Sequence, residues 1–266
     1  MSLRTVHVFA ALFVTALLAL VAMSPAHASG WAEEDGPIET LGAVWLVVAA
    51  FCLLYQFFLG VEREGARALV RNAWLPLLAL LFIFIAGEEI SWGQRIFDFD
   101  TPAALAGNRQ GESNIHNLEI FHGVTAEGER KTGSLASLFV MDRLFTMFWL
   151  SWCLLLPLAW RRPALARRLL TRLRLPMPTV AFGLLFVAVY LATKTLDVTV
   201  AALDSHTLVE TKEAALESLL GMVGVWLWLL TPREIALARD VAPAPERAPD
   251  TVGASPLLRP MRWRRG

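Results

Sequence analysis

Apolar runs of about twenty residues recur along this chain, and they constrain its fold more than any other feature of the sequence. A helix needs roughly 20 mainly apolar residues to cross the hydrocarbon core of a bilayer. After an apolar N-terminal run, hydropathy predicts five further spans, at about residues 41–60, 73–92, 135–160, 179–198 and 214–230. The sequence therefore predicts an all-α fold, a polytopic bundle of transmembrane helices.

The composition excludes other classes of protein. Hydrophobic residues make up 56% of the chain and charged residues 18%, whereas a soluble domain has about 45–50% apolar and 25% charged residues. The formal net charge is zero, which argues against a general nucleic-acid binder. Both cysteines, Cys52 and Cys153, lie inside apolar runs, so a disulfide framework is not expected.

The N-terminal run has two interpretations. Residues 6–23 are apolar except for one histidine and one threonine, and the small-residue pattern Ala26-His27-Ala28 follows. This order is typical of a cleaved signal peptide, and cleavage after Ala28 would leave five spans. The run is also long enough to be an uncleaved helix, which would make six. Residues 1–28 are therefore expected to be a signal peptide or the first membrane helix.

Arginine residues predict the orientation of the bundle. Residues 61–72, residues 161–178 and the C-terminal tail are rich in arginine and share one side when the spans alternate. Positive charge in short loops marks the cytoplasmic side. On this topology the cytoplasmic parts hold 17 Arg against six acids, and the outer parts hold seven Lys and Arg against 18 acids. We therefore expect a multi-pass protein of the bacterial inner membrane with a cytoplasmic C-terminus. Residues 29–240 would form the bundle, and the Pro- and Ala-rich residues 241–266 a disordered basic tail.

Two adjacent acids close the second of these five spans. Glu88 and Glu89 follow an uninterrupted apolar run and open the string GEEISWGQR, residues 87–95. Acids at membrane depth are costly and normally mark a functional path. If the helix continues, Glu88, Ser91 and Arg95 share one face, and we take these three with Glu89 as candidate catalytic residues. The alternative is an ion pair between Glu88 and Arg95 at the membrane surface, with Trp92 as an interfacial anchor.

The outer loop that follows, at about residues 93–134, is the longest in the chain. If residues 112–122 form a short helix, Glu112, His116 and Glu119 line one of its faces, and its apolar face would press it onto the membrane interface. Carboxylate and imidazole at these spacings can bind one metal ion. The alternative is a solvated polar loop with incidental histidines.

A second group of acids approaches the same side of the membrane later in the chain. His206, Glu210, Glu213 and Glu217 are spaced as one helical stripe that enters the last span. We expect Glu88 or Glu89 to approach His116 and Glu217 at the outer mouth of the bundle, because too few cations lie at that depth to pair with the acids. The candidate ligands of a divalent metal ion, with zinc the first choice, are His116, Glu112, Glu213, Glu217 and His206. The candidate substrate-binding residues are Trp92, Gln94, Asn114, Asn117 and Arg143.

Two motifs carry a resemblance to other proteins. The string GEEISWGQR at residues 87–95 is followed by the pattern N-x-Q-x-E-x-N-x-H-N at residues 108–117. Together they resemble a group of uncharacterised bacterial polytopic membrane proteins. The resemblance implies that the two motifs form one unit, and it implies no particular reaction.

Three classes of function fit these patterns. The first is a metal-dependent hydrolase or transferase acting on a lipid-linked substrate at the outer face, with membrane lipid as the partner and no nucleic acid. The second is a non-catalytic membrane protein whose polar cluster is structural. The third is a proton-coupled transporter, which is disfavoured because the acids stay in the outer half of the membrane. The sequence does not identify a protein partner.

Overall fold

A computed structural model of the chain describes residues 3–33, 36–123, 131, 138–161 and 164–230. Within these ranges the chain is helical apart from its loops, and the single β pairing there is an isolated bridge between Asn108 and Leu118. The all-α prediction is therefore confirmed. The predicted tail at residues 241–266 lies outside the described residues, as do residues 132–137 near the start of the third predicted span.

Several helices have the length and composition of membrane spans. In the described part of the chain they are α1 (Leu3–Met23), α3 (Pro37–Glu64), the continuous helix Met141–Trp160 and α11 (Val180–Thr199). A fifth is formed if α5 (Trp74–Glu89) and the segment Ser91–Phe97 count as one span with a bend of 73° between them. The long helix α12 (Ser205–Leu229) is not among them, and its first half carries the charged residues Glu210, Lys212, Glu213 and Glu217.

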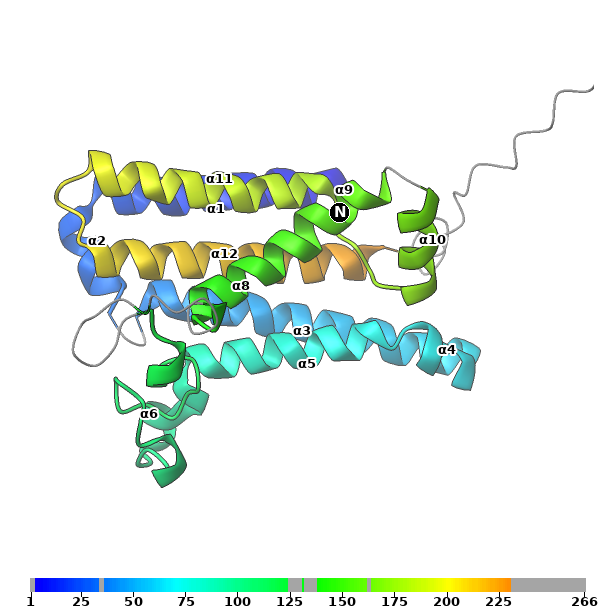
Figure 1. Cartoon of the computed structure of the whole chain (residues 1–266), viewed down its shortest axis with the longest axis horizontal. Coiled ribbons are helices and arrows are strands. Elements are labelled where there is room, and N and C mark those ends of the chain that lie inside the picture. Colours follow the sequence, from blue (N-terminus) through cyan, green and yellow to red (C-terminus); the bar gives the residue numbers. More distant parts are fainter. Residues whose placement is uncertain (1–2, 34–35, 124–130, 132–137, 162–163, 231–266) are drawn as a thin grey trace, which may run out of the picture.

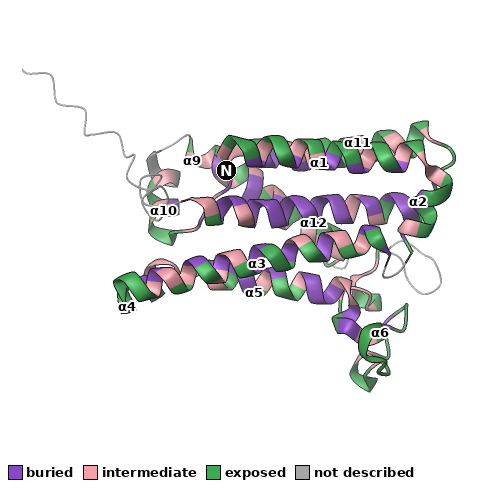
Figure 2. Ribbon diagram, turned by 180° about the vertical axis from the view of Figure 1, so that it is seen from behind, coloured by how far each residue is buried: buried purple, intermediate pink, exposed green. Residues whose placement is uncertain are grey.

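The long helices lie side by side, and α12 runs through their centre. Figure 1 shows α1 and α11 along one side of α12, and α3 and α5 along the other. Helix α8 (Met141–Trp149), a π-helical segment (Leu150–Leu155) and α9 (Leu156–Trp160) cross the bundle obliquely. From Ala214 to Leu227 nearly every side chain of α12 is buried, as Figure 2 shows. A helix that is apolar on all sides belongs in the interior of a bundle.

Glycines bring α12 close to α3. A Cβ atom on Gly221 would lie 2.6 Å from the backbone carbonyl of Trp45, and one on Gly224 would lie 2.6 Å from the Cβ atom of Ala49. Small residues let membrane helices approach so closely that van der Waals packing holds them together. The distance between α3 and α12 is therefore set by close packing, and this packing also sets the distance between the polar side chains at the ends of the two helices.

The N-terminal helix is part of the same core. Val6, Ala10 and Val14 of α1 pack in the cluster that contains the buried leucines of α12. The His7 imidazole Nε2 lies 2.6 Å from the Thr179 hydroxyl, at the start of α11. Cleavage after Ala28 would fall within the short helix α2 (Pro25–Trp31) and would remove α1 from this core.

The predicted spans match the observed helices except at their ends. Helix α3 extends the predicted span 41–60 by four residues at each end. Helix α12 begins nine residues before the predicted start at 214. The predicted span 73–92 is too long, because α5 ends at Glu89.

Candidate functional site

The end of α5 is a sharp turn, and this turn sets the geometry of the polar region. Ser91, Trp92 and Gly93 all have positive φ, at 46°, 55° and 75°. A short helix α6 (Gln94–Phe97) then leads away in a new direction. The expectation that Glu88, Ser91 and Arg95 share one helical face is therefore wrong. Left-handed backbone at residues other than glycine is unfavourable and persists where the surroundings over-determine it.

Glu88 ties the loop back onto the helix that precedes it. Its carboxylate accepts hydrogen bonds from the backbone N–H groups of Ile115, at 2.6 Å, and His116, at 2.9 Å. The indole N–H of Trp92 donates to the other oxygen at 2.8 Å. Glu88 is 4% exposed, so three donors stabilise a buried charge.

Asn108 organises the backbone of the loop. Its side-chain amide donates to the backbone carbonyl and the side-chain oxygen of Asn114, at 2.9 and 2.7 Å. Its side-chain oxygen accepts from the N–H groups of Gln110, at 2.9 Å, and Glu112, at 3.1 Å. One buried asparagine thus fixes the turn by bonding to its own local backbone, as Asx turns do.

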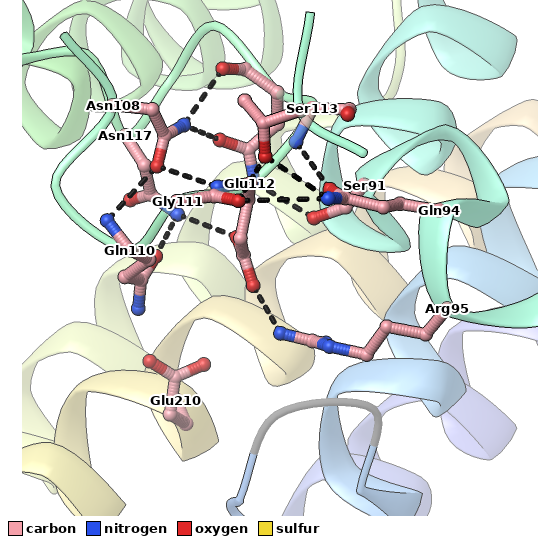
Figure 3. Close-up of polar contacts among 12 residues, drawn as sticks. Ser91, Gln94, Arg95, Asn108, Gln110, Gly111, Glu112, Ser113, Asn117 and Glu210 are labelled. Atoms are coloured by element: carbon pink, nitrogen blue, oxygen red, sulfur yellow. Dashed lines mark hydrogen bonds and ion pairs between the residues drawn. The ribbon is translucent and has the colours of Figure 1, made fainter. Parts of the chain in front are cut away.

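Glu112 is the second anchor of the loop (Figure 3). One of its carboxylate oxygens pairs with the guanidinium of Arg95. The other accepts from the side-chain amides of Asn114, at 2.6 Å, and Asn117, at 3.1 Å. The Asn114 amide also donates to the Ser91 hydroxyl at 3.0 Å. The alternative interpretation, an ion pair between Glu88 and Arg95, is therefore wrong, because Arg95 pairs with Glu112 of the loop.

Residues 112–122 do not form the expected helix. The only helical turn in this stretch is the 3-10 turn Glu119–Phe121. Gly111 has φ of +69°, and the N–H of Ser113 donates to the side chain of Gln94 at 2.6 Å. These tertiary hydrogen bonds use donors that a helix would need for itself. Glu112, His116 and Glu119 consequently do not share a helical face.

A pocket of about 420 Å³ opens between this loop and the ends of α3, α5, α8 and α12. We call it the acidic pocket. Its walls include apolar side chains such as Phe84, Phe145 and Val209. No lysine or arginine is among its described lining residues. The acids that line it are Glu39, Glu88, Glu89, Glu112, Asp142, Glu210, Glu213 and Glu217, and the histidines are His116, His122 and His206.

Glu217 is a buried acid of this pocket that lacks a full set of partners. It is 3% exposed, and its Oε2 atom has no hydrogen-bond partner in the part of the chain that the structure describes. Its carboxyl group faces that of Glu89 from the neighbouring helix. A Cβ atom on Gly42 of α3 would collide with the Glu217 carboxyl group, so this glycine makes room for the buried acid. Two adjoining carboxyls in such surroundings favour a shared proton or a bound cation.

His116 covers the pocket from the loop. Its Nδ1 atom lies 3.7 Å from Glu88 Oε2 and has no closer described partner. Burial of the imidazole opposes its charged form, but the Glu88 carboxylate and the charges of Glu89 and Glu213 outweigh burial and raise the pKa of His116. The second loop histidine differs, because burial and the charge of Arg109 lower the pKa of His122. His116 is therefore the loop imidazole that favours the charged form.

Lys212 pairs with acids of the pocket, although its spacing in the sequence did not predict this role. The Lys212 ammonium group lies 2.6 Å from Asp142 and 3.7 Å from Glu213, which joins α12 to α8. Lys194 does not line the pocket; it lies 3.9 Å from Asp197, and both side chains are well exposed. Glu39 was also missed, because an acid in the first turn of a helix is ordinarily explained by the helix dipole.

The residues selected from the sequence separate into two groups. Those that line the acidic pocket are Glu88, Glu89, Glu112, His116, Asn117, His206, Glu213 and Glu217. Those that are not among its lining residues are Ser91, Trp92, Gln94, Arg95, Asn114 and Arg143. Across the described ranges, no three His, Cys, Asp or Glu side chains have an arrangement that could hold a metal ion.

No protein-family model matches this chain, and neither does a curated protein or a solved structure.

Proposed function

We propose that this protein is a membrane-embedded hydrolase or transferase that acts on a lipid-linked substrate in the acidic pocket, with a divalent metal ion bound there. The observation that carries the proposal is the Glu217 Oε2 atom, which has no hydrogen-bond partner among the described residues and is buried beside Glu89 and six other pocket acids. A buried acid needs a cation, a proton or a hydrogen bond. A bound cation would satisfy several of these acids together.

The charge of the pocket restricts what it can bind. Eight carboxyl groups and no described lysine or arginine line it, so an anionic substrate such as a phosphate ester would be repelled without a bridging cation. The apolar walls at Phe84, Phe145 and Val209 suit the chain of a lipid. Both features together favour a lipid-linked substrate whose polar group meets a metal ion.

The candidate ligands are chosen from the pocket residues whose side chains the loop does not already use, which leaves out Glu112. They are Glu89, Glu213, Glu217 and His116, with His206 at the exposed rim. Carboxylate and imidazole are the ligands that zinc takes in catalytic sites. These side chains do not form a metal-binding group as they stand in the structure, so they would have to draw together to hold a metal. A metal held there would supply an activated water molecule and polarise the substrate oxygen. Pocket acids outside the ligand set, such as Glu39 and Glu210, would accept and return the proton that such a reaction moves.

The hydrogen-bond network of the loop favours a second candidate, a non-catalytic membrane protein. Glu88, Ser91 and Arg95 were expected to be catalytic, yet each bonds to the loop. In this alternative the motif residues only hold the loop on α5, and the acids of the pocket share protons among themselves.

Metal analysis separates the two candidates. Protein purified in detergent, incubated with zinc and desalted, should retain about one zinc per chain. The variants Glu217→Gln and His116→Ala should lose most of it, and the control Glu62→Gln, an exposed acid of α3 outside the pocket, should not. Wild-type protein without retained metal, across zinc, manganese and magnesium, would contradict the proposal and leave the structural role.

The proposal also places the acidic pocket at the outer face of the bacterial inner membrane, with a cytoplasmic C-terminus. The support is the arginine content of the loops at the opposite end. An alkaline-phosphatase fusion after Gly133 should be active and one after Arg239 inactive. The reverse pattern would show that the pocket lies at the cytoplasmic face of the membrane.

A further inference from the structure

A second cavity, of about 240 Å³, lies at the opposite end of the bundle from the acidic pocket. It is formed by the end of α9, by α10 (Ala164–Leu173), by the linker into α11 and by the end of α12. Its described lining is mainly apolar and includes Trp160, Leu170 and Trp226. Arg161 and Arg174 also line it, and no acid does among the described residues. Its charge is thus opposite to that of the acidic pocket.

Three hydrogen bonds from separate helices hold the end of α10 and the linker that follows it, which form one wall. The indole N–H of Trp74, at the start of α5, donates to the Leu173 carbonyl at 2.6 Å. The indole N–H of Trp152 donates to the Pro176 carbonyl at 2.8 Å. The His7 imidazole is 2.6 Å from the Thr179 hydroxyl. A wall fixed from three sides makes a preformed cavity.

We propose that this cavity binds an anionic phospholipid, with the phosphate at Arg161 and Arg174 and an acyl chain along the apolar wall. Arginine is the side chain that best matches phosphate geometry. Basic pockets between membrane helices on the arginine-rich side are recognised sites for anionic lipid headgroups. Trp226 adds a further donor, since it is 6% exposed and its indole N–H has no acceptor in the described chain.

The position of the cavity favours a lipid over a soluble anion. It opens at the arginine-rich end of the bundle, where the apolar helices α9 and α11 meet the apolar C-terminal part of α12. The neighbouring helix α10 places Leu169 and Leu173 beside Arg168 and Arg172, all of them exposed. A helix with exposed leucines and arginines suits the plane of a membrane interface. A phosphate ion alone would leave the apolar part of the cavity unused.

Native mass spectrometry of the full chain in uncharged detergent tests this proposal. Titration with dioleoyl phosphatidylglycerol should give one tightly retained lipid per chain, and dioleoyl phosphatidylcholine should bind at least tenfold more weakly. The double variant Arg161→Gln and Arg174→Gln should lose this preference. The double variant Arg63→Gln and Arg67→Gln, which removes two exposed arginines outside the cavity, should keep it.

Three results would overturn the proposal. The first is equal retention of the two lipids by the wild-type protein. The second is an equal loss in both double variants, which would indicate general attraction to arginine. The third is competition by millimolar inorganic phosphate, which would indicate an anion site without a lipid chain. A separate variant, Thr171→Trp, fills the cavity and keeps both arginines, and it should also abolish retention. The acidic pocket is distant, so metal content should be unchanged in all these variants.

Discussion

Replacing Glu88 by glutamine should release the loop from α5. The wild-type carboxylate accepts from the N–H groups of Ile115 and His116 and from the indole of Trp92. Each hydrogen bond to a charged group contributes about 1.5–3 kcal/mol. An amide keeps one acceptor oxygen and turns an N–H group toward the remaining donors, so at least one such bond is lost. We therefore expect docking of the loop to weaken by about 2–4 kcal/mol.

Amide hydrogen exchange measures this weakening directly. A loss of 2 kcal/mol corresponds to about 30-fold faster exchange at the two backbone amides that Glu88 accepts from, and 4 kcal/mol to nearly 1,000-fold. The matched control is Asp98→Asn, in the same segment, because Asp98 is exposed and asparagine tolerates its φ of +50°. If exchange at both amides in Glu88→Gln stays within threefold of wild type, Glu88 does not hold the loop and the reasoning is wrong.

Three other predictions concern packing, pH and the N-terminus. Gly221→Ala should lower the free energy of unfolding of the detergent-solubilised protein by about 1–3 kcal/mol, because its new Cβ atom meets the backbone of α3. The control Gly30→Ala should have little effect, because its Cβ atom meets nothing within 4 Å. The pKa of His116 is raised in the folded protein, so protonation of this histidine should stabilise the docked loop fully below the unfolded pKa of about 6.5. This stabilisation should be lost as the pH rises through the folded pKa. Protection of the loop amides, corrected for intrinsic exchange, should therefore fall from pH 6 to pH 9, and a fall of equal size in His116→Gln would refute this. Intact-mass measurement of the purified protein should show a chain that retains α1 and begins at Met1, because α1 packs in the core, and a start at Ser29 would show that the bundle forms without it.

The helices could be predicted because hydropathy is a local property. The free energy of moving a side chain from water to lipid depends on the residue itself, so apolar runs indicate spans without knowledge of their neighbours. The convergence of Glu89, His116 and Glu217 was also predictable, since unpaired acids at the same depth must find one another, a cation or water. Their shared lining of one pocket agrees with that expectation.

The turn after Glu89 could not be predicted in the same way. Its cause is a set of hydrogen bonds between residues 17 to 28 positions apart, such as those from Arg95 to Glu112 and from His116 to Glu88. A search for residues that share a helical face covers only two or three turns of sequence, so it does not detect such partners. The same tertiary bonds override the helix expected at residues 112–122. The packing of α1 was ambiguous for a different reason, because a signal peptide and a first helix share the same apolar pattern.

The network that joins the two motifs also bears on how such a sequence can change over time. Arg95 and Glu112 are each other's charged partner, and Asn114 bonds to both Glu112 and Ser91. Losing one member would leave a buried charge or donor unpaired, which costs more than losing both together. Single substitutions here should therefore be selected against, while paired ones survive. The network residues within positions 88–117 should therefore be conserved or changed together, even where the surrounding helices vary.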